Sequence, residues 1–437
     1  MEFLTARQAA AELGITAATL YAYVSRGLIR SEAVPGSRAR QYRREDVLAF
    51  RQRKEVRADP GRAAAGVLHW GVPVLESAIT LITGGRLFYR GLSATDLACA
   101  RDFEEVAALL WSGTLGLMPA APSAPATAGR LAAVAERLGP VSAFERLQIL
   151  LPLAGTLDPA AYDLRPGALQ LTAARILRLV AAVAAGDPEK AAGRGAAGDP
   201  AEAAGRSAAG DSGRATGLGA TGRGAAGRSA ADLLAGAHGL TDRPARDLLN
   251  AALVLTADHE LNVSAFAARC VASAGATPYA VVSAGLAALQ GGKHGGHCDR
   301  VEALFEEAAA AKDAAACLAA RLRRGEDIPG TSPPLYPEGD PRGRLLVDLA
   351  TAVRPRSPQV ALAHALEEGM RELLGERPSV DFGLVTAARA LGLPPGSAIA
   401  LFAVGRTAGW LGHAIEQYGL DRMIRPRARY VGPTPEC

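Results

Sequence analysis

The sequence predicts an all-α fold, and two observations carry that prediction. Hydrophobic residues make up 49% of the 437 residues, but aromatic residues contribute only 5%, because alanine dominates the apolar set. Such a composition suits closely packed helices better than sheets, which favour β-branched and aromatic side chains. The second observation is that long amphipathic segments alternate with Gly- and Pro-rich loops, without the apolar runs typical of parallel strands. A chain of this length also exceeds one typical domain and can bury a large core.

Charge and cysteine content narrow the class of protein. The formal net charge of +4 is small for this length, which excludes a chain that coats nucleic acid along its whole surface. Five cysteines form no C-x-x-C pair and are odd in number, so we expect a reduced, cytoplasmic protein. The first residues lack the apolar core of a signal peptide, and Arg175 and Arg178 interrupt the longest apolar run, from 168 to 185. We therefore expect no contact with a membrane.

The first 58 residues are predicted to form a separate unit. A helix from Thr5 to Glu12, with a Thr cap, ends at Gly14, and a second helix runs from Thr16 to Ser25. A polar, basic segment follows, and a last helix runs from Glu45 to about Arg53. This order is similar to a winged helix-turn-helix of the regulator or excisionase type.

Candidate DNA contacts within this unit fall into two groups. Side chains on the second helix would face a groove, and arginines of the following basic segment would contact phosphates. The candidates are Thr16, Thr19, Tyr21, Arg26, Arg38, Arg40 and Arg43. The alternative is a small three-helix docking module whose basic rim is merely solvated.

A linker from 59 to 66 leads into the rest of the chain. Apolar runs on either side of Gly84-Gly85 predict a β-hairpin. Residues 186–230 are low-complexity Gly/Ala sequence without large apolar side chains, so we predict a disordered surface insert. Helices are expected at 97–115, 128–138, 143–153, 265–272, 281–289, 300–324, 345–351, 360–374, 385–391 and 398–415.

The stretch from Thr256 to Arg300 is the predicted active site. It holds His259 and His294, two of only seven histidines, each beside a break in a helical pattern. Asn262 or Ser264 is expected to cap the helix that starts near 265. The glycines around His294 end the next helix and leave that side chain beside bare backbone. The alternative for each histidine alone is a partly buried side chain that hydrogen-bonds to the backbone.

Several motifs in this region carry a family resemblance. DHELNVSAFAAR, followed some thirty residues later by GGKHGG, closely resembles the citrate synthase family. Further matching pieces occur in the family's order: Asp340-Pro-Arg342, Ser379-Val-Asp381-Phe382, Arg406 with Gly409-Trp410, and Ile424-Arg425-Pro426. The resemblance covers the chain from about Val67 to its end. It implies a large helical domain, 67–296 and 388–437, interrupted by a small domain, 297–387, which closes over a cleft.

The resemblance also implies a reaction and roles for residues. The family joins an acyl-CoA to a 2-oxo acid and hydrolyses the resulting thioester, using acyl-CoA as substrate and no other cofactor. Asp381 would then be the base and His294 would face the thioester carbonyl; the alternative for Asp381 is a helix cap. The matching ligands of the dicarboxylic 2-oxo acid are His259, Arg342, Arg406 and Arg425. Because the arginine matching Arg425 reaches a neighbouring subunit's site in the family, a homodimer is expected.

One loop departs from the family pattern. Family members carry a third catalytic histidine in a stretch resembling PGFGHRVY, whereas residues 329–336 read PGTSPPLY and place Pro333 at that position. Proline has no side-chain donor, so activation of the oxo acid's carbonyl is expected to be weak. Thr331 or Ser332 could supply a weaker donor. Slow condensation, improved by Pro333→His, is the expected result.

Two further interpretations remain beside the enzyme. His294, His297 and Cys298 offer side chains that zinc accepts, but the glycines fix no ligand geometry, so no metal site is predicted. The fold could instead serve as a metabolite sensor that controls the helix-turn-helix. The fusion and Pro333 favour the sensor, whereas Asp381, which a sensor does not need, favours the enzyme.

Overall fold

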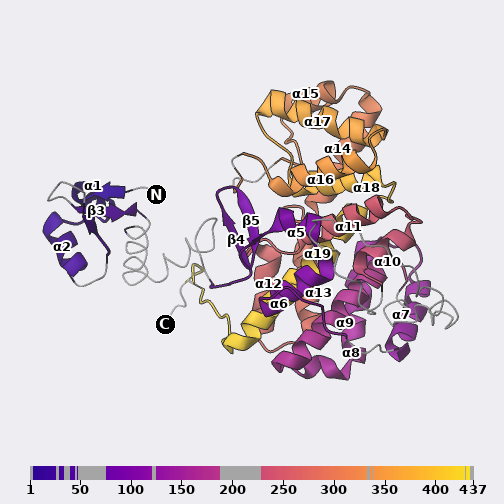
Figure 1. Cartoon of the computed structure of the whole chain (residues 1–437), viewed down its shortest axis with the longest axis horizontal. Helices are drawn as coiled ribbons and strands as arrows, with labels where there is room; N and C mark the ends of the chain where they lie inside the picture. The colour runs from indigo at the N-terminus through magenta and orange to yellow at the C-terminus, as the bar shows by residue number, and fades with distance from the viewer. Residues whose placement is uncertain are drawn as a thin grey trace, which may run out of the picture. The chain divides into compact units, whose positions relative to one another are not determined.

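The computed structural model describes residues 3–25, 29–33, 40–44, 47, 75–120, 125–187, 228–331, 335–336, 338–428 and 430–433. The chain forms two compact units (Figure 1). The first comprises Met1–Glu76 with Pro426–Cys437, and the main unit comprises Ser77–Arg425. The predicted linker and nearly all of the predicted insert lie outside the described residues, so both stay predictions.

The first unit contains the two predicted helices and a small antiparallel sheet. Its elements are β1 (Phe3–Thr5), α1 (Ala6–Glu12), α2 (Ala17–Ser25), β2 (Glu32–Ala33) and β3 (Arg40–Arg43), with strand order β1-β3-β2. The Thr5 side chain accepts from the backbone N–H of Gln8, whose side chain accepts from Thr5 N, which confirms the predicted Thr cap. The predicted helix from Glu45 to Arg53 falls outside the described residues, except for Val47.

A small core holds the first unit together. Leu4, Ala9, Leu20, Tyr42 and Val47 are buried against one another, so both helices and the sheet contribute to it. This core joins α1 and α2 to β3.

The main unit begins with the predicted hairpin. β4 (Thr80–Thr83) pairs antiparallel with β5 (Arg86–Tyr89), which pairs with β6 (Leu92–Ser93). Gly84 and Gly85 both have positive φ, +57° and +69°, which the two-residue turn requires. The hairpin prediction is confirmed.

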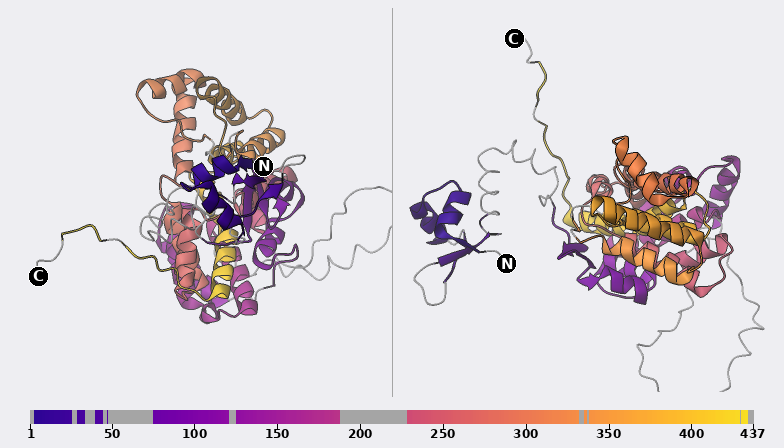
Figure 2. Two further views of the ribbon diagram at one scale, coloured as in Figure 1. Left: turned by 90° about the vertical axis from the view of Figure 1, so that its left-hand side faces the viewer. Right: turned by 90° about the horizontal axis from the view of Figure 1, so that it is seen from above.

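Helices make up the rest of the main unit, in two groups. Figures 1 and 2 show α14 to α18 together at one end, the segment predicted to form the small domain. The helices are α5 (Ala94–Ala100), α6 (Phe103–Ser112), α7 (Pro125–Arg137), α8 (Ala143–Leu157), α9 (Pro166–Ala184), α10 (Ala230–Ala237), α11 (Arg243–Thr256), α12 (Val263–Ser273), α13 (Pro278–Leu289), α14 (His297–Ala311), α15 (Ala314–Arg323), α16 (Pro341–Val353), α17 (Pro358–Leu374), α18 (Val380–Ala390) and α19 (Ser397–Leu420), with a 3₁₀ turn at Pro159–Tyr162.

Two helices predicted as continuous are each broken in two, so those predictions were wrong. The segment 97–115 breaks before Asp102. The backbone N–H of Asp102 donates to the Glu105 carboxylate at 3.1 Å, and this contact marks the start of a new helix, α6. The segment 300–324 breaks at Lys312, with φ +56°, and Asp313 then caps α15. In both places an aspartate starts a new helix more favourably than it continues the old one.

The core of the main unit is built around α19. Nearly all of its side chains from Ser397 to Ala414 are buried. At Gly405 an added Cβ would lie 2.1 Å from Thr256 Oγ1, so only glycine permits this close approach to the end of α11. By length and composition alone, α9 and α19 are long and apolar enough to cross a membrane. In this structure 67% and 94% of their apolar windows are buried, as in core helices.

Candidate active site

His294 lies in a tight turn between α13 and α14. A Cβ at Gly296 would lie 2.4 Å from the carbonyl oxygen of Gln290, so the turn depends on glycine. The backbone N–H of His294 donates to Gly291 O at 2.8 Å, and that of Gly296 donates to Leu289 O at 3.0 Å. The turn therefore fixes the backbone position from which the His294 side chain extends.

Contacts from α12 and α19 hold the His294 ring. Its Nε2 lies 2.7 Å from Ser264 Oγ, and its edge meets Phe402 at a centroid distance of 6.0 Å. Trp410 Nε1 donates to the same Ser264 oxygen at 3.1 Å. Burial, and then the charge of Arg406, lowers the pKa of His294 to about 3. At neutral pH the ring is uncharged and can offer one N–H to a ligand.

His259 is held in the same neutral form. Its Nε2 lies 2.8 Å from Tyr336 Oη. Burial, and then the charges of Arg342, Arg406 and His294, lower its pKa well below the usual value. Asn262, which follows it, accepts from the backbone N–H groups of Ser264 and Ala265, so Asn262 rather than Ser264 caps α12.

Arg342 is a buried cation that is already paired. Its Nε donates to Asp340 Oδ1 at 3.0 Å and its Nη2 to Asp340 Oδ2 at 2.7 Å. Asp340 also caps α16 and accepts from Val380 N at 3.2 Å, so one carboxylate joins the starts of α16 and α18. Burial alone would lower the pKa of Arg342, but the Asp340 carboxylate, together with Tyr336, opposes burial and the net effect raises the pKa.

Arg406 is a buried cation without such a partner. Its Nε donates to Thr256 O at 2.7 Å, and its guanidinium lies 4.9 Å from the Phe402 ring centroid. Its Nη1 is buried with no hydrogen-bond partner among the residues that the structure describes. Burial lowers the pKa of Arg406 to about 10, so it stays charged at neutral pH. An unpaired buried donor is costly, which favours an acceptor brought by a ligand.

Asp381 lies in the first turn of α18 but does not cap it. Ser379 Oγ accepts from Phe382 N and is the cap, so the structural alternative for Asp381 does not hold. Cys298 Sγ donates to Asp381 Oδ1 at 3.2 Å. Burial raises the pKa of Asp381, while His297, the hydrogen bond from Cys298 and the charge of Arg342 oppose the rise. The carboxylate is a stronger base than an exposed aspartate.

These groups act on one another electrostatically. Arg342 and Arg406 both lower the pKa of His259, and Asp381 raises that of Arg406. Five of the six predicted catalytic and substrate-binding residues thus belong to one network. The sixth, Arg425, follows α19 with an exposed side chain. Ser332 and Pro333 lie outside the described residues, and Thr331 forms a backbone bridge with Pro378.

Three participants were not predicted. Tyr336, which contacts His259, appeared in the sequence only as the end of the divergent loop. Ser264 was considered only as a cap, and Cys298 only as a metal ligand. Each contact spans 30 or more residues of sequence, so no local pattern indicated it. Within the described part of the chain, no group of three or more His, Cys, Asp or Glu side chains is placed to hold a metal ion.

The candidate DNA contacts are partly engaged inside the first unit. Thr16 Oγ1 accepts from Thr19 N at 3.2 Å, which places Thr16 at the start of α2. Arg43 pairs with Glu32 at 2.7 Å, and Arg40 donates to Ser31 O at 3.3 Å. Tyr21 on α2 is 53% exposed. Arg26 and Arg38 lie outside the described residues.

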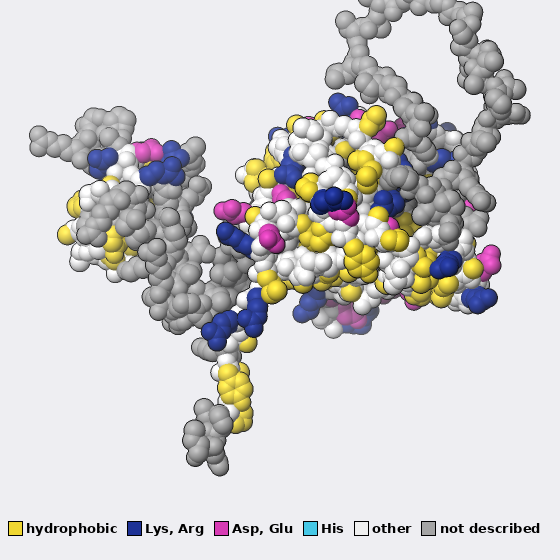
Figure 3. Space-filling model, turned by 90° about the horizontal axis from the view of Figure 1, so that it is seen from below, with side chains coloured by type: hydrophobic (Ala, Val, Ile, Leu, Met, Phe, Trp, Pro, Cys, Tyr) yellow, Lys and Arg dark blue, Asp and Glu magenta, His cyan; other side chains and the backbone are white. Residues whose placement is uncertain are grey.

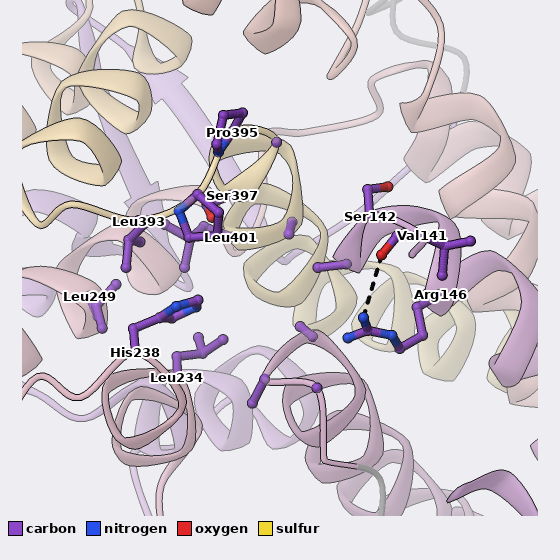
Figure 4. Close-up of a pocket in the computed structure, with 17 residues that line it drawn as sticks. Val141, Ser142, Arg146, Leu234, His238, Leu249, Leu393, Pro395, Ser397 and Leu401 are labelled. Carbon is purple, nitrogen blue, oxygen red and sulfur yellow. Dashed lines mark hydrogen bonds between the residues drawn. The ribbon is translucent and has the colours of Figure 1, made fainter. Parts of the chain in front are cut away.

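A cavity of about 350 Å³ lies at the N-terminal end of α19 (Figure 4). Arg146 and His238 line it together with leucines from α10, α11 and α19. Since none of the predicted catalytic residues lines this cavity, it is separate from the site described above.

Comparison with known proteins gives the family. Residues 66–427 match "Citrate synthase, C-terminal domain", and residues 3–55 match "Helix-turn-helix domain". "Citrate synthase 2" of Bacillus subtilis is 34% identical over 190 residues, 43% of this chain and 51% of that protein. "Citrate synthase" of Haloferax volcanii is 34% identical over 185 residues, 41% of this chain and 49% of that protein. The chain thus spans about half the length of the curated relatives it matches.

Solved structures give the fold. Citrate synthase from Thermotoga maritima superposes with a TM-score of 0.63 at 25% identity, covering 84% of this chain and 95% of that one. A Thermoplasma acidophilum citrate synthase, in complex with carboxymethyl coenzyme A and oxaloacetate, superposes with a TM-score of 0.66 at 22% identity and covers 84% of this chain and 95% of that one. The predicted all-α class, with a helix-turn-helix before it, is confirmed.

Proposed function

The chain belongs to the citrate synthase family, and from this premise we propose that it condenses a short acyl-CoA with oxaloacetate or a similar 2-oxo acid. Acetyl-CoA is the expected acyl donor. The observation that carries the proposal is the conjunction of a buried carboxylate of raised pKa, Asp381, with two neutral histidines and an unpartnered guanidinium nitrogen on Arg406.

Enolisation of the acyl-CoA falls to Asp381 and His294. The carboxylate removes a proton from the carbon beside the thioester, and the raised pKa of Asp381 makes it a better acceptor than an ordinary aspartate. The neutral His294 hydrogen-bonds to the thioester oxygen as negative charge develops on it. No metal or other cofactor takes part in this proposal.

Recognition of the oxo acid falls to the two buried arginines and His259. A guanidinium meets a carboxylate with parallel hydrogen bonds, and both arginines are charged at neutral pH. The buried Nη1 of Arg406, which has no partner among the described residues, can donate a hydrogen bond to the ligand's carboxylate. Arg342 is held rigidly by Asp340, so little entropy is lost when it binds.

Oligomeric state, location and DNA binding extend the proposal. The exposed Arg425 is available to a second copy of the chain, which supports a homodimer with a site completed across the interface. The first unit supports DNA binding, and a cytoplasmic location suits both parts. On the face seen in Figure 3, basic and acidic side chains of the main unit are interspersed, so we assign DNA contact to the first unit.

A retardation assay tests the DNA-binding part. Dimers should retard a library of duplex DNA at low salt, and binding should weaken steeply as salt rises, because several arginines displace counterions. Arg40→Ala should reduce the salt dependence. A monomer by light scattering, or no retardation at low salt, contradicts this part of the proposal.

The metabolite sensor remains a second candidate. The loop that carries Pro333 in place of a histidine favours it, as does the match to a helix-turn-helix domain. A sensor needs the arginines but no base. Asp381→Asn therefore separates the two, since it should abolish catalysis and leave oxaloacetate binding intact.

The deciding experiment is a thiol-release assay with oxaloacetate and either acetyl-CoA or propionyl-CoA. Turnover should be measurable in the intact protein and fall by about 10²- to 10⁴-fold in Asp381→Asn and His294→Ala. Exchange of the acyl-CoA methyl protons with deuterated solvent, in the presence of oxaloacetate, isolates the enolisation step. If the intact protein shows neither exchange nor thiol release with any short acyl-CoA, the enzyme proposal falls and the sensor stands.

A further inference from the structure

Condensation creates a need that the residues assigned so far do not meet. When the enolate carbon attacks the ketone carbon of the oxo acid, the carbonyl electron pair moves to oxygen, which must accept a proton or a strong hydrogen bond. His294 serves the thioester, and the arginines serve the carboxylates. A further donor in the site is required.

Tyr336 is a buried hydroxyl in that site. Its side chain is 2% exposed, and its Oη lies 2.8 Å from His259 Nε2. The guanidinium of Arg342 lies 5.5 Å from its ring centroid. Tyr336 is the last residue of the stretch 329–336. Its backbone carbonyl accepts from Gly339 N at 2.9 Å, which fixes its backbone four residues before Asp340.

Three other hydroxyl or thiol groups among the described residues of the site are already engaged. Tyr89 Oη donates to Val254 O at 3.0 Å, and Cys298 Sγ donates to Asp381. The Ser264 hydroxyl contacts Asn262 Oδ1 at 2.8 Å and His294 Nε2. The Tyr336 hydroxyl is not committed as a donor in this way, because the His259 Nε2 that it contacts can be either donor or acceptor.

We propose that Tyr336 is the proton donor to the oxo acid's carbonyl oxygen, with His259 as the group that frees its hydroxyl. The inference rests on the proposed condensation. In the ligand complex the neutral His259 carries its proton on Nε2 and donates to Tyr336 Oη, so in this proposal His259 acts on the oxo acid through the tyrosine and not by a direct hydrogen bond. The tyrosine O–H then points to the ligand.

The step balances in protons and electrons. Asp381 has taken one proton from the acyl carbon. The enolate pair forms the carbon–carbon bond, the carbonyl pair moves to oxygen, and that oxygen takes the Tyr336 proton. The resulting phenolate is stabilised by the nearby charge of Arg342 and by the His259 N–H. Water returns a proton to Tyr336 and removes one from Asp381 before the next turnover.

Electrostatics are consistent with this role. Burial raises the pKa of Tyr336 to about 12, against the opposing charge of Arg342, so the hydroxyl is protonated at neutral pH. The same cation favours the phenolate once a proton has left. His259, whose pKa is far below neutral, does not compete as an acid.

The test compares two partial reactions in Tyr336→Phe. Methyl-proton exchange with deuterated solvent should stay within about threefold of the parent, because Asp381 and His294 are intact. Thiol release should fall by about 10²- to 10³-fold, the usual cost of losing one such donor. Calorimetry should show oxaloacetate binding within a few-fold, which establishes that the variant is folded.

The matched control is Tyr418→Phe. Tyr418 is partly buried and donates to Ala276 O, away from the network, so its loss should leave both partial reactions unchanged. Thiol release within about fivefold of the parent in Tyr336→Phe overturns the inference. So does a parallel loss of exchange and oxaloacetate binding, which marks a structural role. An intact protein that shows neither exchange nor thiol release overturns the proposed function itself, and the inference with it.

Discussion

The two halves of the site differ in how their cations are satisfied. On one side α19 carries Arg406, whose Nη1 is buried with no partner among the described residues. On the other side α16 carries Arg342, which Asp340 holds through two hydrogen bonds of 3.0 and 2.7 Å. Both are buried to a similar degree, 1% and 3% exposed. The difference therefore lies in pairing and not in depth.

This contrast separates a structural task from a ligand task. The Arg342–Asp340 pair also ties the starts of α16 and α18 together through Val380 N, so it shapes the half of the site that carries Asp381. Arg406 ties little beyond Thr256 O. The protein itself pairs and orients Arg342, whereas Arg406 keeps a donor that an anionic ligand can use.

The largest expected effect is on stability in Arg342→Ala. Removing this guanidinium leaves the Asp340 carboxylate buried and unpaired, which costs about 3–5 kcal/mol. Urea unfolding of the variant measures the loss. Arg342→Ala should also lose oxaloacetate binding by calorimetry.

Arg406→Ala is the matched comparison. It should lose oxaloacetate binding as completely but cost much less stability, because it removes a buried cation with an unsatisfied nitrogen. Equal destabilisation in the two variants would show that pairing with Asp340 does not change how much an arginine contributes to the free energy of unfolding. Undiminished oxaloacetate affinity in both would remove the assignment of either arginine to the substrate.

A second expected effect is on the pH dependence of stability. The folded pKa values of His259 and His294 lie below the ordinary value of about 6.5. For such histidines the unfolded chain binds more protons, so their contribution is present above the unfolded pKa and is lost as pH falls below it. Each adds a slope of up to about 1.4 kcal/mol per pH unit.

Asp381 has the opposite sign. Its raised pKa means that the folded state binds more protons than the unfolded one, so its contribution is lost as pH rises through the folded pKa. Unfolding free energy measured from pH 7 to 5 should fall with a slope that flattens in His294→Asn. A parent protein of constant stability over this range would contradict the assignment of neutral, buried histidines.

How much of this could be predicted from sequence depends on distance along the chain. The Thr5 cap, the Gly84-Gly85 turn and the end of α13 at Gln290 were predicted because their signals lie within a few residues. The breaks at Asp102 and Lys312 were missed because a single cap residue interrupts an otherwise continuous apolar pattern.

The site shows the same limit. The family motifs named His259, His294, Asp381 and the buried arginines, but not which arginine is paired. Asp340 lies two residues from Arg342, so that pair could have been foreseen, whereas the state of Arg406 depends on packing against α11. The contact between Tyr336 and His259 spans 77 residues and follows from the tertiary fold alone.

The smallest expected effect comes from Cys298, which lies beside Asp381 at the start of α14. Its thiol donates to Asp381 Oδ1 at 3.2 Å, which stabilises the carboxylate and lowers its pKa against the effect of burial. Cys298→Ala removes the donor, so the pKa of Asp381 should rise further. Since the base must be deprotonated to work, the acid limb of the rate profile should move to higher pH, with a loss of about tenfold or less, because a thiol is a weak donor.

Cys298→Ser and Cys317→Ala complete that test. Serine offers a stronger donor and should move the acid limb back toward lower pH, while Cys317, a buried cysteine of α15 away from the site, should have no effect on the profile. Profiles of methyl-proton exchange are the better measurement, because they report proton removal by Asp381 without the later steps. A lower rate in Cys298→Ala at every pH, with no movement of the limb, would mean that the thiol only fills space. A shift of the limb that serine reverses would instead establish that the half of the site preorganised by Asp340 is also tuned by its neighbours, in contrast to the half around Arg406.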